Sequence, residues 1–185
     1  MKKKAGLLTI IFVSVVILII YLFLCLGAYL YPLKYIEIIE KYGIEYSVDK
    51  SLIASVINTE SSFNKNAVSS KGAKGLMQIT DKTAIWLCDI LGEIYAEEKM
   101  YDAEFNIKLG TYYLSYLLNK FDDLDTALAS YNAGEGVVKS WLLSTEYSEN
   151  GYTITNIPYT ETKNYVQKVH KNMDVYAKKI QIRLF

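Results

Sequence analysis

The sequence of 185 residues contains few of the residue types that build cross-links and metal sites: two cysteines and one histidine. Cys25 falls in a long apolar run near the amino terminus, and Cys88 is alone in the rest of the chain. No disulfide can therefore join two parts of that rest. With His170 as the only histidine, a Cys–His catalytic pair or a histidine metal site has little material to work with.

The chain also has no formal net charge at pH 7. The chain has 20 basic and 20 acidic residues, and the balance is 17 to 20 without the three lysines at residues 2–4. A domain with this balance has no electrostatic basis for binding nucleic acid, so we exclude that class of partner. Glycine and proline are sparse, and we find no internal repeat and no low-complexity segment. The length predicts one domain with a substantial core.

The amino-terminal part is long, apolar and free of charge from residue 5 to residue 31. This run exceeds the roughly 20 residues that span a bilayer as a helix. A cleavable signal peptide is the alternative, but its apolar region is usually about 7 to 15 residues and ends in a small-x-small site. We therefore predict a cytoplasmic basic end at residues 1–4, a transmembrane signal anchor at 5–31, and a domain at 36–185 on the extracytoplasmic side of the cell membrane.

The remainder reads as all-α, because apolar residues recur at helical spacing and no segment alternates as a strand does. Capping residues divide it into helices. We expect a first helix at 33–42 closed by Gly43, and a second, capped by Ser47 or Asp49, that reaches Glu60. After an irregular but partly ordered loop at 61–79, further helices are expected at 81–91, 102–120, 123–132, around 137–142, and from 159 or 160 onward.

Glu60 stands out because it shares a helical stripe with Ile53, Val56 and Ile57. A carboxyl held at the edge of a core loses hydration, which raises its pKa toward the range that a general acid needs near neutral pH. The alternative is that Glu60 lies just past the helix and turns to solvent. Periodicity alone does not decide between the two.

The letters that follow Glu60 do decide. The segment "ESSFNKNAVSSKGAKGLMQIT" at 60–80 resembles the signature of the soluble lytic transglycosylase family, whose catalytic domain has a lysozyme-like fold. The resemblance continues through "MYDAEFNIKLGTYYLSYLL", "ALASYNAGEGVVKSW" and "YTETKNYVQKV", in the order of the family, and covers roughly residues 36 to 178.

The resemblance implies that Glu60 is the catalytic residue and that a set of matched residues binds substrate. The matched tyrosine, Tyr131, points at the catalytic carboxyl in the family, and Lys163 stands where the family usually has arginine. The implied substrate-binding residues are Ser69, Gly75, Leu76, Met77, Gln78, Tyr131, Asn132, Ala133, Glu161 and Tyr165.

Several of these residues also have ordinary structural roles. Met77 could fill the core instead of packing against sugar rings, and Gln78 could cap a turn. Ser69 is a common loop residue, and Tyr131 could bond a backbone carbonyl instead of holding a protonated carboxyl. Glu161 is favourable in the first turn of a helix for electrostatic reasons alone.

The implied reaction uses one carboxyl twice, and residues 61–80 contain no Asp or Glu that could serve as a second. Glu60 would first act as acid and then as base. It would cleave the β-1,4 bond between N-acetylmuramic acid (MurNAc) and N-acetylglucosamine (GlcNAc) in peptidoglycan and form a 1,6-anhydro ring. This reaction needs no metal and no cofactor. The alternatives are a hydrolytic muramidase similar to goose-type lysozyme, which needs a second carboxylate, and a non-catalytic peptidoglycan-binding scaffold.

Overall fold

The structure, a computed structural model, describes the backbone of residues 2–183 and the side chains of residues 12–183. The chain divides into two compact units, residues 1–33 and 34–185. Met1, the first residue of the expected cytoplasmic end, and residues 184–185, the end of the expected domain, lie outside the described residues.

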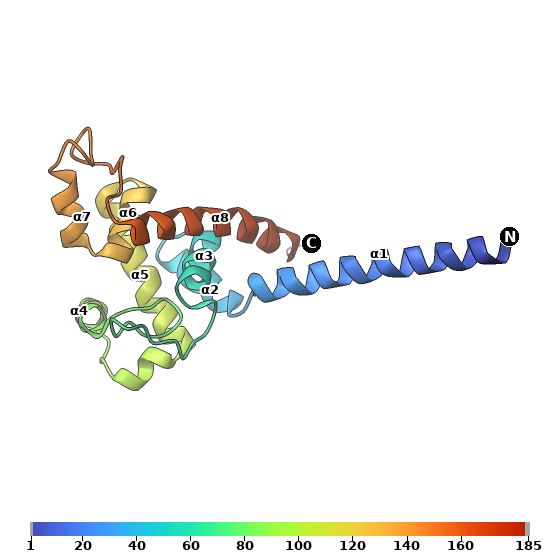
Figure 1. Cartoon of the computed structure of the whole chain (residues 1–185). Helices are drawn as coiled ribbons and strands as arrows, with labels where there is room; N and C mark the ends of the chain where they lie inside the picture. The colour runs from blue at the N-terminus through green and yellow to red at the C-terminus, as the bar shows by residue number, and fades with distance from the viewer. Residues whose placement is uncertain (1, 184–185) are drawn as a thin grey trace. The chain divides into compact units, whose positions relative to one another are not determined.

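The first unit is a single helix, α1 (Lys2–Leu30), drawn in blue in Figure 1. Its segment Phe12–Leu30 has a mean hydropathy of 2.7 and no buried share within the structure. By length and composition this helix could cross a membrane, which is the property expected of residues 5–31.

The described part of the second unit consists of helices and connecting loops, as expected for an all-α domain, with only isolated β-bridges in the loop that follows α3. Side chains of Asp49, Thr80, Asp102 and Asp123 accept backbone N–H groups at four helix starts. The elements are α2 (Ile36–Glu45), α3 (Lys50–Ser61), α4 (Asp81–Leu91), η1 (Glu97–Tyr101), α5 (Ala103–Phe121), α6 (Leu124–Ala133), α7 (Glu135–Leu142) and α8 (Thr160–Arg183).

Gly43 does not end the first of these helices, so that expectation is wrong. It lies inside α2, which continues to Glu45, and it is buried. A Cβ at Gly43 would come 2.9 Å from the carbonyl oxygen of Val48. The residue is therefore glycine because the chain after α2 approaches it closely, and not because the helix stops there.

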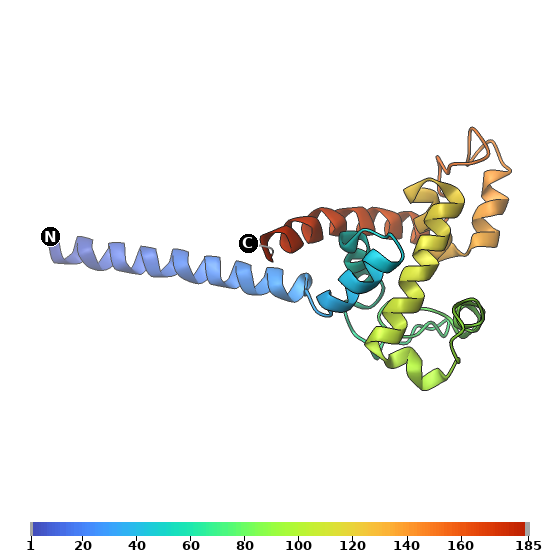
Figure 2. The ribbon, with the colours of Figure 1, turned by 180° about the vertical axis from the view of Figure 1, so that it is seen from behind.

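The core lies where α3 packs against α8 and where α5 contacts α2, α4 and α6. Both views show α8 lying along α3, with α5 running from α6 toward η1 (Figures 1 and 2). Met77, from the loop between α3 and α4, packs against Gly110 of α5 so closely that a Cβ on that glycine would collide with its sulfur. The fully buried side chains include Ile39, Ile53, Ile57, Leu87, Ile107, Leu109, Leu114, Leu117 and Tyr176.

Candidate active site

Glu60 lies in the last turn of α3 and is half-buried. Ile53, Val56 and Ile57, which share its stripe, are each 0% exposed, so the helix is fixed beneath it. Burial raises the pKa of Glu60 to about 7, because a carboxylate loses hydration there. The alternative in which Glu60 turns to solvent beyond the helix is therefore wrong.

Three groups of α8 also shift the pKa of Glu60. Hydrogen bonding by Tyr165 and the positive charge of Lys168 lower the pKa of Glu60, whereas the negative charge of Glu161 raises it. None of these effects outweighs burial. The Tyr165 hydroxyl is buried near the Glu60 carboxyl, and no other group among the described residues forms a hydrogen bond with it.

Tyr131, at the end of α6, approaches Glu60 from another side. Its hydroxyl donates a 2.9 Å hydrogen bond to the carbonyl oxygen of Met77. Burial, followed by the nearby charge of Glu60, raises the pKa of Tyr131 well above its usual value. The phenol therefore stays neutral. Its donated bond goes to the backbone, so it can act on a protonated Glu60 only as an acceptor.

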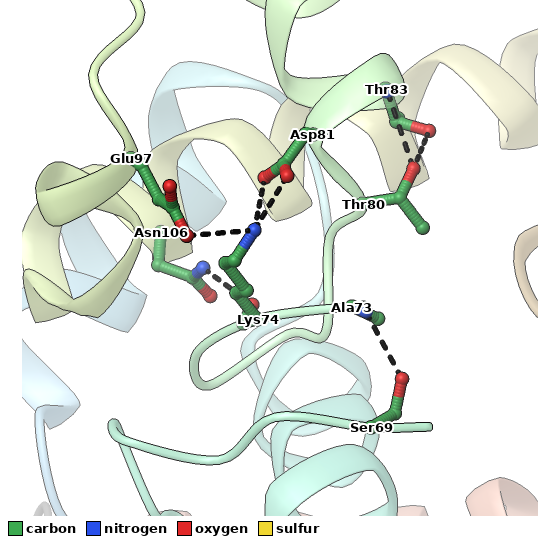
Figure 3. Close-up of polar contacts among 8 residues, drawn as sticks. All are labelled: Ser69, Ala73, Lys74, Thr80, Asp81, Thr83, Glu97 and Asn106. Carbon is green, nitrogen blue, oxygen red and sulfur yellow. Dashed lines mark hydrogen bonds and ion pairs between the residues drawn. The ribbon is translucent and has the colours of Figure 1, made fainter. Parts of the chain in front are cut away.

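The loop between α3 and α4, residues 62–80, is fixed from below by one buried asparagine of α5. Asn106 is 0% exposed; its Oδ1 accepts the N–H of Met77 at 2.7 Å, and its Nδ2 donates to the carbonyls of Lys74 and Met100 at 3.0 Å each. Figure 3 shows Asn106 beside Lys74, with a dashed line for its hydrogen bond to the Lys74 backbone. Buried backbone groups that no helix could pair are satisfied in this way.

Lys74 and Gly75 complete this attachment. The Lys74 ammonium lies 2.7 Å from Asp81 and 3.3 Å from Glu97, so it joins the loop to α4 and η1 (Figure 3). Gly75 has φ +79°, and a Cβ there would collide with Asn106 and with the carbonyl of Met100. Only glycine allows the backbone to adopt this conformation so close to α5.

Gln78 has the unusual backbone angle φ +50° and holds the loop with its own side chain. Its Nε2 donates to the carbonyls of Ala67 at 3.2 Å and Gly75 at 2.9 Å. Because both amide protons are used in this way, the oxygen is the part of Gln78 that remains for a ligand.

Glu60 and these elements enclose a cavity of about 180 Å³, called the Glu60 cavity below. Ser69 lines it and also accepts the N–H of Ala73 at 3.0 Å, as drawn in Figure 3. Lys71 and Glu161 line it together, with 3.5 Å between Nζ and Oε1. Its lining residues are Glu60, Ser69, Lys71, Ala73, Gln78, Thr80, Tyr131, Asn132 and Glu161.

A second cavity of about 260 Å³, called the Tyr113 cavity, continues from the first. The two share Gln78, Thr80, Tyr131 and Asn132, so they are parts of one groove. The second is also lined by Ile79, Thr83, Tyr113, Ala133 and Gly134. An elongated ligand could pass Glu60 and extend between α4, α5 and the end of α6.

The structure gathers most of the predicted site residues at this groove. Glu60, Ser69, Gln78, Tyr131, Asn132, Ala133 and Glu161 line one cavity or both. Asn132 also accepts the hydroxyl of Thr162 at 2.8 Å, which joins α6 to α8.

Three predicted residues lie below the groove instead. Gly75 is buried against α5, and the side chains of Leu76 and Met77 are each 0% exposed. Met77 is therefore a core residue and does not present its sulfur to a sugar ring. Its contribution to the groove wall is its backbone, through the Asn106 and Tyr131 hydrogen bonds.

Other residues were missed by sequence reasoning. Asn106 is a polar residue on an otherwise apolar helix face, a signal that was present in the pattern. Thr80 serves both as the cap of α4 and as a groove residue. Lys71 carried no signal, because its position opposite Glu161 depends on how α8 returns to the loop.

A carboxyl whose pKa is about 7 is protonated in a large fraction of molecules at neutral pH, so it can act as a general acid and, after losing its proton, as a general base. Glu161, which the family resemblance places at the site, is a second carboxylate at the same cavity. It is 73% exposed and paired with Lys71. The described side chains contain no cluster of His, Cys, Asp and Glu that could hold a metal ion.

Residues 37–154 match the family described as "Transglycosylase SLT domain". The chain is 32% identical over 144 residues to the soluble lytic murein transglycosylase of Escherichia coli strain K12, covering 75% of this chain and 22% of that protein. It is also 32% identical over 161 residues to membrane-bound lytic murein transglycosylase C of Haemophilus influenzae strain PittEE, covering 75% of this chain and 45% of that one. The chain thus spans about a fifth to under half of these relatives.

Solved structures agree with this match. An inactive glutamate-to-glutamine mutant of the lytic transglycosylase Slt from Pseudomonas aeruginosa superposes with a TM-score of 0.73 at 30% identity, over 82% of this chain and 25% of that one. The 70 kDa soluble lytic transglycosylase of Escherichia coli gives a TM-score of 0.71 at 28% identity, over 81% and 25%. The expected lysozyme-like transglycosylase fold is confirmed.

Proposed function

The chain belongs to the transglycosylase SLT domain family, and on that premise we propose that it is a peptidoglycan lytic transglycosylase that cleaves the MurNAc-β-1,4-GlcNAc bond. The observation that carries the proposal is Glu60, a half-buried carboxyl with a pKa of about 7 that lines an elongated groove. Relatives named lytic murein transglycosylases support the same activity.

Glu60 takes both catalytic roles in this proposal. Protonated, it donates to the glycosidic oxygen, and the acetamido group of the substrate stabilises the anomeric carbon. The resulting carboxylate then accepts the proton of the muramyl C6 hydroxyl, whose oxygen attacks C1 and closes the 1,6-anhydro ring. Water is not consumed, and the proton given in the first step is recovered in the second.

The phenols around Glu60 support this exchange. Tyr165 lowers the pKa of Glu60 and therefore favours the carboxylate that the second step needs. Tyr131 can accept a hydrogen bond from the protonated form, since its own proton is directed at Met77. For substrate, the groove offers the Gln78 amide oxygen, the Ser69 hydroxyl and Asn132.

Glu161 keeps one alternative open. A muramidase needs a second carboxylate to activate water, and Glu161 is available at the Glu60 cavity. The transglycosylase assignment has the stronger support, because Glu161 is mostly exposed and its charge is engaged by Lys71.

The reachable substrate is glycan close to a membrane. The apolar helix α1 is consistent with membrane anchoring, and a membrane-bound lytic transglycosylase is among the relatives. With lysines at residues 2–4 favouring the cytoplasmic face, residues 34–185 would lie on the extracytoplasmic side of the cell membrane as a single-pass protein.

The test is mass spectrometry of muropeptides released from purified peptidoglycan by the full chain in detergent micelles. We expect products that end in 1,6-anhydro-MurNAc from the parent and from the control Glu149→Gln, an exposed carboxyl, and none from Glu60→Gln. Reducing ends that disappear with Glu161→Gln would establish the muramidase instead. Binding of peptidoglycan without any release would favour the scaffold.

A further inference from the structure

We propose that Trp86, Tyr113 and Tyr116 form an aromatic platform that binds additional sugar rings of the glycan strand, beyond the Tyr113 cavity. The identity of the strand as glycan rests on the proposed function. The position of the platform rests on its contact with the groove, because Tyr113 lines the Tyr113 cavity and its ring contacts both Trp86 and Tyr116.

The aromatic rings form an unbroken series that starts beside Glu60. Tyr131, at both cavities, lies 5.3 Å from Tyr113 between ring centroids. Tyr113 stacks with Tyr116 at 6.4 Å and an interplanar angle of 13°. Trp86 stands nearly perpendicular to both, 6.1 Å from Tyr113 and 5.2 Å from Tyr116. The series thus leads from the catalytic carboxyl to the outside of the domain.

The spacing along α4 and α5 explains why the platform lies beside the Tyr113 cavity. Thr83 of α4 and Tyr113 of α5 line the Tyr113 cavity. Trp86 and Tyr116 each lie three residues later, so each stands on the same helix face about one turn further along. Their rings lie 5.2 Å apart between centroids, so one aromatic surface spans α4 and α5 beside the cavity.

Trp86 is not buried as a packing residue would be. It is 38% exposed, and Tyr113 and Tyr116 are both partly exposed. Aromatic rings at helical spacing usually serve the core, but core aromatics in this domain, such as Tyr176 at 0%, are closed off from solvent. An exposed aromatic surface beside a groove is typical of a surface that a ligand covers.

The platform is held rigid by a charged network. The Tyr116 hydroxyl donates to Glu135 at 3.0 Å, and Lys120 and Lys139 lie 2.7 and 2.6 Å from the same carboxylate. Although burial alone would raise the pKa of Glu135, hydrogen bonds from Lys120, Lys139 and Tyr116 lower it to about 2. The ring of Tyr116 is therefore fixed before any ligand arrives, which limits the entropy lost on binding.

The chemistry of the surface fits a saccharide. The C–H face of a pyranose ring packs on an aromatic face. A polymer with a regular repeat can occupy the Glu60 cavity, the Tyr113 cavity and the platform in succession. The strand would then continue past the cleaved bond on this side.

The test measures binding of glycan strands of two lengths to the full chain in the Glu60→Gln background, where strands stay intact. We expect Trp86→Ala to weaken binding of strands of roughly eight or more sugars about tenfold, and binding of a tetrasaccharide by less than about twofold. Trp86→Phe should restore most of the loss, because it keeps an aromatic face. Ile90→Ala, an exposed apolar residue of the same helix, should change neither.

The proposal is overturned if Trp86→Ala and Trp86→Phe both leave the preference for long strands intact, or if they weaken short and long strands equally, which would indicate a packing role. It is also overturned if no strand binds the Glu60→Gln protein. Cleavage by the parent is measured separately. If the parent binds long strands through Trp86 but releases no product, the proposed function fails and the platform stands.

Discussion

Two irregular segments of the domain, residues 62–80 and 143–159, are each organised by one asparagine, but in opposite surroundings. Asn106 holds the first from beneath and is 0% exposed. Asn150 organises the second from within: its Oδ1 accepts the N–H groups of Tyr152 and Thr153, and it is exposed. The first segment lines the groove beside Glu60, whereas no residue of the second lines either cavity.

The comparison teaches that irregular backbone can be as well fixed as a helix when a buried side chain replaces the missing hydrogen bonds. Water can take over the bonds of Asn150, but it cannot reach those of Asn106. A groove wall must keep its shape while a ligand enters and leaves, and the buried arrangement provides this.

The largest effect is expected from removing the two asparagines in turn. Asn106→Ala leaves the N–H of Met77 and the carbonyls of Lys74 and Met100 buried without their partner. We expect a loss of about 4 kcal/mol in the free energy of unfolding, and less than about 1 kcal/mol for Asn150→Ala. Urea unfolding of the two variants measures both values. Similar losses would mean that burial does not separate the segments.

A pair of glycines sharpens the comparison. Gly75 and Gly151 both have positive φ, +79° and +75°. A Cβ at Gly75 would collide with α5, whereas the nearest atom to one at Gly151 is 3.8 Å away. We expect Gly75→Ala to cost about 3 kcal/mol and Gly151→Ala about 1 kcal/mol, the second from backbone strain alone. Thermal unfolding would contradict this if the two melting temperatures fell by equal amounts.

A pair of carboxyls extends the comparison to charge. The pKa of Glu60 is raised to about 7, so the stability of its neutral form is fully present below the unfolded value near 4.5 and is lost as pH rises through 7. Glu60→Gln should therefore be more stable than the parent by about 2 kcal/mol at pH 8 and equal to it at pH 4. Urea unfolding at the two pH values measures this.

The matched change for Glu60→Gln is Glu149→Gln, in the exposed segment. It should leave stability unchanged at both pH values. A gain at pH 8 that Glu149→Gln shared, or one that persisted at pH 4, would contradict the assignment of the raised pKa to Glu60.

The smallest effect tests whether a residue of segment 62–80 contributes to the free energy of unfolding because it belongs to the segment or because it is buried. Lys71 belongs to residues 62–80 but is 75% exposed in its pair with Glu161. Lys71→Ala should change the free energy of unfolding by less than about 0.5 kcal/mol, as for most surface ion pairs. A larger loss would show that the segment depends on its exposed contacts as well.

Local rules predicted much of this molecule. Of the two caps considered for α3, Asp49 is the one observed, and α4, α5 and α6 begin within one residue of the expected starts, because capping depends on a few neighbouring residues. The stripe through Glu60 made a position at the edge of the core one of two possibilities, and the structure shows that it is the correct one. These features depend on short spacings, which a sequence displays directly.

Tertiary contacts were harder to predict. Gly43 was misread because its close neighbour, Val48, is reached only after the chain turns. Met77 was assigned to the groove because nothing local shows that α5 covers it. Glu161 was placed at the site only through the family resemblance, because it comes from a helix a hundred residues downstream of Glu60.

The contact of Met77 with Gly110 has a consequence for how this sequence can change. A methyl group on Gly110 would occupy the space of the Met77 sulfur, so neither position can vary independently of the other. A larger residue at 110 becomes acceptable only after a smaller one appears at 77, and in that order. Residue 77 of the loop and residue 110 of α5 must therefore change together in evolution, and a change at 77 has to precede an enlargement at 110.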